Sequence, residues 1–189
     1  MNVLTDKFPT KIRINDKIYD INADFRNCLK IITAFEDEDL CASDRYEVLI
    51  RLLYKDFHII STNDVAEAIK LGIKFLDCGE DPPDGPAPKR VYSFEKDGKF
   101  IYSAIKQTHQ IDLEQIDFLH WWKFVFLFSD INSDCAFANI VHLRDKRNRG
   151  KLSKEERAIY NRSREILDLN YNREPTEDER DFMRRLKGV

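Results

Sequence analysis

Apolar and polar residues alternate with a period of two near the start of the chain. The alternation covers residues 11–14 (KIRI) and 18–21 (IYDI), and the polar residues 15–17 (NDK) stand between them. This pattern predicts a short β-hairpin with one apolar face. Because an isolated hairpin is only marginally stable in water, we expect it to cover part of the core of the helices that follow.

After residue 22 the apolar period becomes that of an α-helix, and three helices are predicted. The first has Asn22 or Asp24 as its cap, the second begins at Ser43, and the third begins at Thr62 and stops at Cys78-Gly79, where glycine can adopt the left-handed conformation. Their apolar stripes are Phe25, Cys28, Leu29, Ile32 and Phe35; Val48, Leu49, Leu52 and Leu53; and Val65, Ile69, Ile73 and Leu76. Gly72 leaves a gap on the last stripe.

Four prolines in residues 79–89 predict a loop, and three more helices are expected after it, over residues 93–108, 112–129 and 133–144. Gly98 falls inside the first of these, so a hairpin at Asp97-Gly98 is the alternative. The helix 112–129 starts with a capping box, Asp112-x-x-Gln115, and is apolar almost all the way round. We therefore predict that it is central and buried, with Trp122 in the core.

The composition changes after residue 143. Residues 144–164 hold nine Lys or Arg against three acids, and only a thin apolar stripe remains. Two capping boxes, at Ser153 and Thr176, predict two exposed helices hinged near residues 170–175. The fold class predicted is mainly α: a helical domain with a small N-terminal β-hairpin over residues 1–143, and an exposed, charged helical tail over residues 144–189.

Composition and charge restrict the function classes. The chain has 189 residues, 42% of them hydrophobic, and a net charge of −3, which does not favour binding to nucleic acid or membrane through overall charge. Its longest apolar run, residues 124–128, is far shorter than the ~20 residues of a membrane-spanning helix. We see no secretory signal and expect a cytosolic protein.

Candidate chemistry is sparse. The sequence contains no phosphate-binding glycine loop, no nucleophile elbow and no zinc-protease motif, so we predict no catalytic residues, no cofactor and no metal, and hence no enzyme. The four cysteines are widely spaced, which favours reduced thiols over disulfides or zinc ligands. Cys135 and His142 lie seven residues apart on one helical face, and two ligands are a weak metal signal. For His120 we expect a structural role, with the ring reaching a polar partner.

The basic segment 144–164 is the best alternative feature. Clustered Lys and Arg can neutralise phosphates, but Tyr160 is its only aromatic residue, and residues 1–143 hold 17 basic against 24 acidic side chains. A charged helical face for an acidic protein partner explains the same residues. The predicted partner-binding residues are Arg147, Arg149, Lys151, Ile159, Ile166 and Leu167.

The central third of the chain resembles a known family. The residues that carry the resemblance are 92–104 (YSFEKDGKFIYSA), 111–113 (IDL) and 119–124 (LHWWKF), and residues 151–156 (KLSKEE) also fit. They are similar to small phage and prophage proteins of Gram-positive bacteria that are encoded between the major tail protein and the tape-measure protein, often regarded as tail assembly chaperones.

The resemblance implies a non-enzymatic helper in the host cytoplasm. Such a protein would bind the long, aggregation-prone tape-measure protein until the tail subunits polymerise around it, alone, as a homo-oligomer or with a second tail chaperone. Two alternatives remain: a structural component retained in the finished particle, and a nucleic-acid-binding regulatory protein that uses residues 144–164.

Overall fold

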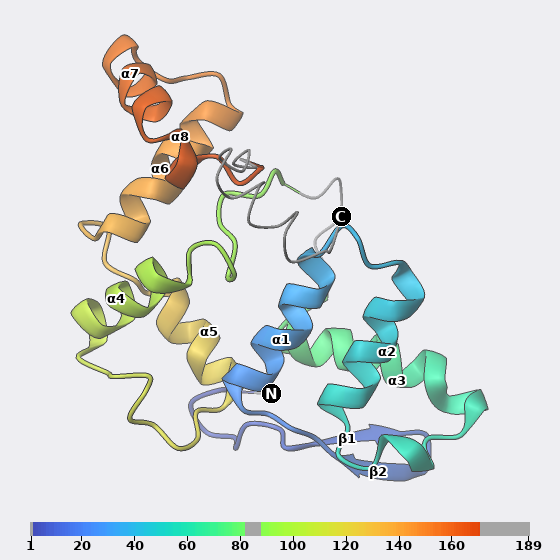
Figure 1. The fold of residues 1–189 in the computed structure, drawn as a ribbon. Helices are drawn as coiled ribbons and strands as arrows, with labels where there is room; N and C mark the ends of the chain where they lie inside the picture. Colours follow the sequence, from blue (N-terminus) through green and yellow to red (C-terminus); the bar gives the residue numbers. More distant parts are fainter. Residues whose placement is uncertain (1, 82–87, 171–189) are drawn as a thin grey trace, which may run out of the picture. The chain divides into compact units, whose positions relative to one another are not determined.

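The computed structural model describes residues 2–81 and 88–170, and the fold is mainly α, as predicted. The described residues form eight α-helices, two short 3₁₀ helices and one two-stranded hairpin (Figure 1). The chain divides into two compact units, residues 1–139 and 140–189. The division falls inside helix α6 (Ala136–Asn148), a few residues before the boundary predicted at 143/144.

The predicted hairpin is confirmed. Strands β1 (Lys11–Ile14) and β2 (Lys17–Asp20) are antiparallel, with Ile12 opposite Tyr19. The turn uses Asn15 at φ 51°, a left-handed conformation that asparagine tolerates. Ile14 and Tyr19 are buried on the face that β1 presents to helix α3, so the hairpin covers helical core as expected.

The three helices predicted next are present. They are α1 (Phe25–Glu36), α2 (Ala42–Leu53) and α3 (Val65–Leu76); the 3₁₀ turns η1 (Phe57–Ile59) and η2 (Thr62–Asp64) lie between the last two. Asp24 caps α1 by accepting the Arg26 N–H at 3.0 Å, whereas Cys41, before α2, makes no side-chain cap. The helices pack α1 on α2 and α2 on α3 (Figure 1). Gly72 makes the second contact close, because a Cβ there would lie 2.7 Å from Leu49 Cδ2.

The end of α3 is held by the two tryptophans. Gly79 is left-handed (φ 84°), as predicted, and Cys78 before it is left-handed as well (φ 57°). The indole N–H groups of Trp121 and Trp122 donate to the carbonyls of Leu76 and Phe75, each at 2.8 Å. The middle of the predicted loop 79–89 lies outside the described residues.

The predicted helix 93–108 begins later than expected. Helix α4 covers Gly98–His109, so Gly98 is its first residue rather than an interior one, and the alternative hairpin at Asp97-Gly98 is wrong. The turn before α4 is fixed by the buried Asp97 carboxylate, which accepts the Ser93 N–H at 2.9 Å.

Only the second half of the predicted helix 112–129 is helical. Helix α5 covers only Trp121–Ser129, and His120 rather than Asp112 caps it. Asp112 instead accepts the Tyr102 hydroxyl at 2.6 Å and the Lys106 ammonium at 2.8 Å. The segment before α5 is irregular, and Arg26 of α1 donates to its carbonyls of residues 113 and 116 at 2.7 and 2.6 Å. These two carbonyls, which would accept backbone N–H groups in a helix, are thus satisfied by a side chain.

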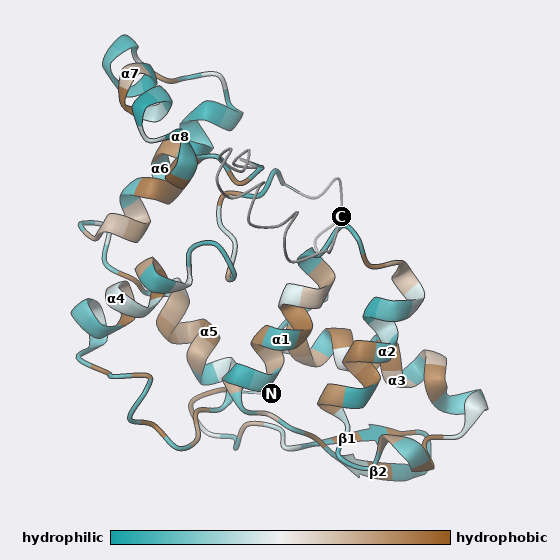
Figure 2. Cartoon of the chain, in the orientation of Figure 1, coloured by the Kyte–Doolittle hydropathy of each residue, from teal (hydrophilic) through white to brown (hydrophobic). Residues whose placement is uncertain are grey.

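Helix α5 is nevertheless central to the first unit, and most of its residues are hydrophobic (Figure 2). Phe124 is 1% exposed and stacks on Phe25 of α1 with ring centroids 4.9 Å apart, and on Trp121 at 5.7 Å. Trp122 is 5% exposed, which confirms its predicted place in the core.

The second unit is described over residues 140–170. Helix α6 starts and ends later than the predicted 133–144, and the first predicted tail helix is broken at Ser163 into α7 (Lys154–Arg162) and α8 (Arg164–Leu167). The capping box at Ser153 is confirmed, with Glu156 as its reciprocal partner. The second tail helix, predicted from Thr176, lies outside the described residues.

Candidate functional site

The six predicted partner-binding residues all lie in the second unit, but they do not form one surface. Ile159 and Ile166 are 51% and 45% exposed, whereas Leu167 is 3% exposed and lies inside the unit. Arg149, one residue beyond α6, pairs with Asp145 of α6 at 2.9 Å, and the Lys151 N–H donates to the Lys146 carbonyl at 2.8 Å. A role for any of the six in binding a partner stays a prediction.

Arg147 is the member of this set that lines a cavity. Its guanidinium lies over the Tyr160 ring at 4.6 Å and donates to the Tyr160 hydroxyl at 2.6 Å. It also lies 3.4 Å from the Asp168 carboxylate. The Tyr160 hydroxyl donates in turn to the Leu167 carbonyl at 2.9 Å, so Arg147 is anchored to the interior of the unit.

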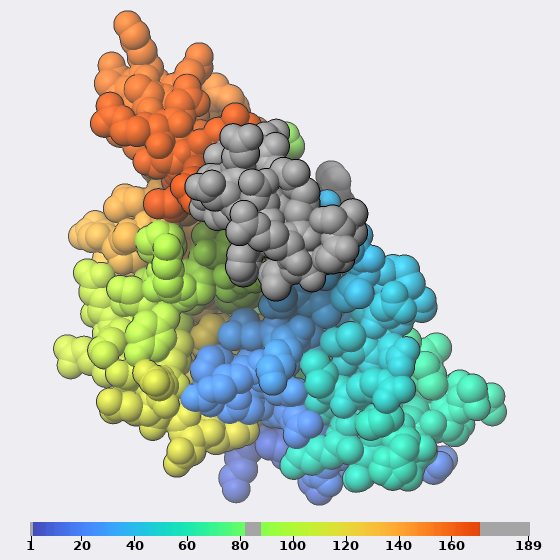
Figure 3. Space-filling view, in the orientation of Figure 1, coloured from blue at the N-terminus to red at the C-terminus, as the bar shows by residue number. Residues whose placement is uncertain are grey.

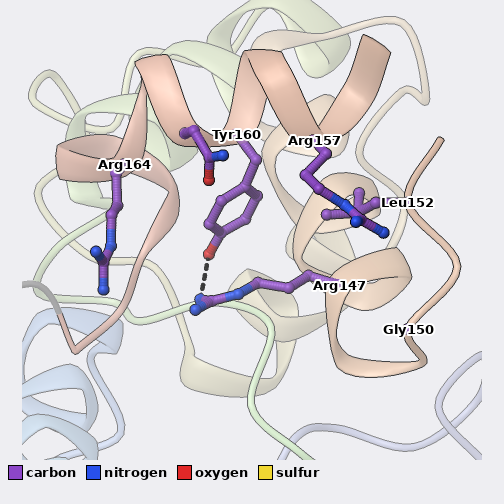
Figure 4. A pocket seen from close by; sticks show the side chains of 7 residues that line it. Arg147, Gly150, Leu152, Arg157, Tyr160 and Arg164 are labelled. Atoms are coloured by element: carbon purple, nitrogen blue, oxygen red, sulfur yellow. Dashed lines mark hydrogen bonds between the residues drawn. The ribbon is translucent and has the colours of Figure 1, made fainter. Parts of the chain in front are cut away.

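The cavity has a volume of about 400 Å³ and is strongly basic (Figure 4). Three arginines line it, one each from α6, α7 and α8, and the Arg157 side chain extends toward Leu152 (Figure 4). Besides Gly150, its lining consists of Arg147, Leu152, Arg157, Tyr160, Asn161 and Arg164.

Local sequence signals build this cavity. Gly150 (φ 68°) ends α6 in a Schellman motif, in which the Gly150 and Lys151 N–H groups donate to the Arg147 and Lys146 carbonyls. The Ser153 capping box then starts α7 three residues later. The lining residues that follow on α7 have the spacing i, i+3 and i+4, which places them on one face: Arg157, Tyr160 and Asn161. Arg164 lies beyond the break at Ser163, at the start of α8.

One carboxylate serves two of the three arginines. Asp168 lies 3.2 Å from Arg164 and 3.4 Å from Arg147. Burial acts to raise the pKa of Asp168, but hydrogen bonds from Arg164, the Asn170 backbone and Arg147 outweigh it and hold that pKa below its usual range. Asp168 is therefore ionised at neutral pH. Because two guanidinium groups share this single charge, the cavity keeps an excess of positive charge.

A second concave surface, the α2–α3 groove, lies on the first unit and is apolar. It has a volume of about 410 Å³ and is formed by two pairs of side chains at i, i+4 spacing, Tyr46 with Ile50 on α2 and Val65 with Ile69 on α3, together with Phe57. Glu47 and Arg51, which form an ion pair at 2.7 Å, also line it. Exposed side chains of α2 contribute to the surface shown in Figure 3.

Sequence reasoning missed this groove. It assigned α2 one inward stripe, and Leu49 and Leu53 are indeed fully buried. Tyr46 and Ile50 form a second apolar stripe beside the first, and only one of the two stripes can face the core of the unit. The signal in the sequence was that the apolar residues of α2 cover a wider arc of the helix than one core-facing stripe needs.

The remaining candidates have structural roles. As expected, His120 reaches polar partners: Nδ1 accepts the Trp122 N–H at 3.1 Å, so Nε2 carries the hydrogen and donates to the Pro9 carbonyl at 2.9 Å. Burial lowers the His120 pKa. Cys28 and Cys135 are buried free thiols, and burial raises the pKa of Cys78 to about 12. Over residues 2–81 and 88–170, no three His, Cys, Asp or Glu side chains gather as a metal site would require.

No helix within the part of the chain that the structure describes is long and apolar enough to cross a membrane.

Residues 4–169 match the family described as Bacteriophage Gp15 protein. The match covers both described units, and the chain belongs to this family. Membership of a bacteriophage protein family, expected from the resemblance of the central third, is thereby confirmed. No curated protein and no solved structure matches the chain.

Proposed function

We propose that the protein is a non-enzymatic tail assembly chaperone that binds the phage tape-measure protein in the host cytoplasm before the tail polymerises. The observation that carries this proposal is the match to a bacteriophage family over residues 4–169, which suggests a structural or assembly role. The resemblance of residues 92–124 to tail assembly chaperones supports the more specific role.

The α2–α3 groove supports a partner of the required kind. An amphipathic helix binds a groove by placing apolar side chains at i, i+3, i+4 and i+7 into it. The groove offers apolar side chains from two adjacent helices, including Ile50 and Ile69, with the Glu47–Arg51 pair beside them. A long helical protein whose apolar stripe is not yet covered by tail subunits fits such a surface.

Co-expression tests the proposal. The tape-measure product should remain soluble when it is co-expressed with this chain, and the two should elute together in gel filtration. Ile50→Ser in the groove should weaken this complex. Ile18→Ser should not, because Ile18 is 54% exposed on β2 and lies outside the groove. Separate elution at micromolar concentration with unchanged solubility would contradict the proposal. Detection of the chain in purified particles would favour a structural tail component instead.

A further inference from the structure

The arginine-lined cavity of the second unit plays no part in the proposed binding of a partner helix by the α2–α3 groove. We propose that it binds acidic side chains of a protein partner, with a Glu or Asp carboxylate held between Arg157 and Arg147. This inference rests on the proposed function only in taking the partner to be a protein.

The charge balance of the second unit supports an anionic ligand. Residues 140–170 contain nine Lys or Arg and five Asp or Glu, a surplus of four positive charges. Asp168, which does not itself line the cavity, pairs with both Arg147 and Arg164. No described residue forms an ion pair or side-chain hydrogen bond with the Arg157 guanidinium. An arginine fork matches a carboxylate in geometry as well as charge, through two parallel N–H···O bonds.

The cavity is prepared for such a ligand before it binds. Arg147 is held by the Tyr160 ring and hydroxyl, and Tyr160 itself is 4% exposed. A guanidinium that is already fixed loses less side-chain entropy on binding than a mobile one. Leu152 adds an apolar wall on the Arg157 side, which suits the methylene groups of a glutamate better than a bare inorganic ion (Figure 4).

The same residues disfavour nucleic acid. Binding to single strands combines basic residues with exposed aromatic rings on which bases stack. Tyr160 is the only Phe, Trp or Tyr in residues 140–170, and its ring is covered. The cavity is also a discrete pocket lined by residues of α6, α7 and α8 rather than an extended basic track, so it fits single side chains of a folded or helical segment.

Fluorescence anisotropy with the full chain tests the inference. The probe is a fluorescein-labelled peptide of repeated Glu-Ala-Leu-Ala units, compared with the same peptide carrying Gln for Glu and with a labelled oligothymidylate. The Glu peptide should bind most tightly, and Arg157→Gln should weaken it about tenfold, the loss expected for a charge-assisted hydrogen bond. Arg157→Lys should fall between wild type and Arg157→Gln, because it keeps the charge and loses the fork.

The matched control is Arg162→Gln, which removes the same charge from the same helix outside the cavity and should change affinity by less than about twofold. Equal losses in the two glutamine variants, or tighter binding of oligothymidylate through Arg157, would overturn the inference. The co-expression assay separates this outcome from failure of the chaperone function. A tape-measure complex that is insensitive to Arg157→Gln refutes only the cavity, whereas Arg157-dependent peptide binding without a tape-measure complex refutes only the function.

Discussion

The packing of Trp122 provides the sharpest test of the fold. Its ring lies against Phe75 at 5.9 Å, Phe8 at 6.1 Å and His120 at 6.2 Å, and its indole N–H donates to the Phe75 carbonyl. Its Cζ2 and Cη2 atoms also lie within 3.6 Å of the position a Cβ on Gly79 would take. Trp122→Ala would therefore empty the junction of α3, α5 and the N-terminal segment.

The expected loss of stability is large. Replacing a buried Trp by Ala costs about 3–5 kcal/mol through lost transfer free energy and the cavity that remains. Trp122→Phe removes the indole N–H and the five-membered part of the ring but keeps a six-membered ring, so its cost combines the lost hydrogen bond with a smaller loss of packing. The Phe75 carbonyl also accepts the Cys78 N–H at 3.1 Å, so it keeps one partner after the indole is removed. We therefore expect loss of the hydrogen bond by itself to lower the free energy of unfolding by only about 1 kcal/mol.

Urea denaturation followed by fluorescence measures both values. The chain has two tryptophans, so Trp121, itself 3% exposed, remains as the reporter of the first unit in each Trp122 variant. Phe118→Ala is the control, because Phe118 is 57% exposed and its loss should change stability by less than about 0.5 kcal/mol. A cost below about 1 kcal/mol for Trp122→Ala, as for surface substitutions, would refute the packing described.

Three further predictions concern caps. Burial lowers the pKa of His120 in the folded chain, so the unfolded chain binds this proton at a higher pH than the folded chain does. The free energy of unfolding should therefore be constant above about pH 6.5 with respect to this group and should fall as the pH drops toward the folded pKa. His120→Asn, which keeps a cap acceptor for the Trp122 N–H, should make stability depend less on pH in melts from pH 7 to 5. Gln110→Gly should raise the free energy of unfolding by about 0.5–1 kcal/mol, since Gln110 is exposed at φ 58°, and Gln110→Ala should give no gain. Ser153→Ala should destabilise the second unit by about 1 kcal/mol, measured by circular dichroism, whereas Ser153→Asp should largely preserve it.

The elements predicted correctly from sequence are those whose determinants are local. The hairpin follows from alternation over residues 11–21, and α1 from its apolar stripe and the Asp24 cap, which accepts an N–H two residues away. The capping box at Ser153 likewise lies within four residues. In each case the partners that satisfy the backbone are neighbours in the chain, so their pattern is visible in the sequence.

The failure at residues 112–120 has the opposite origin. The sequence contains a capping box at Asp112, but Tyr102 and Lys106 of the preceding helix engage its carboxylate. Arg26, nearly ninety residues earlier, donates to two carbonyls of the segment. Tertiary contacts of this kind override local propensity, and no periodicity reveals them. The missing helical turns are thus a consequence of packing against α1 and α4.

The basic segment shows why charge must be counted by helix face rather than along the chain. Arg147, Arg149 and Lys151 are close in sequence, yet only Arg147 lines the cavity, because Arg149 turns to Asp145 and Lys151 follows the left-handed Gly150. The other two arginines of the cavity, Arg157 and Arg164, come from the next two helices. The sequence shows that they are seven residues apart, but it shows neither the break at Ser163 that places Arg164 on α8 nor the left-handed Gly150 turn that brings α7 back toward Arg147. A cluster of side chains from helices on either side of a chain reversal can therefore be predicted from the sequence only after the helix cap that causes the reversal has been recognised.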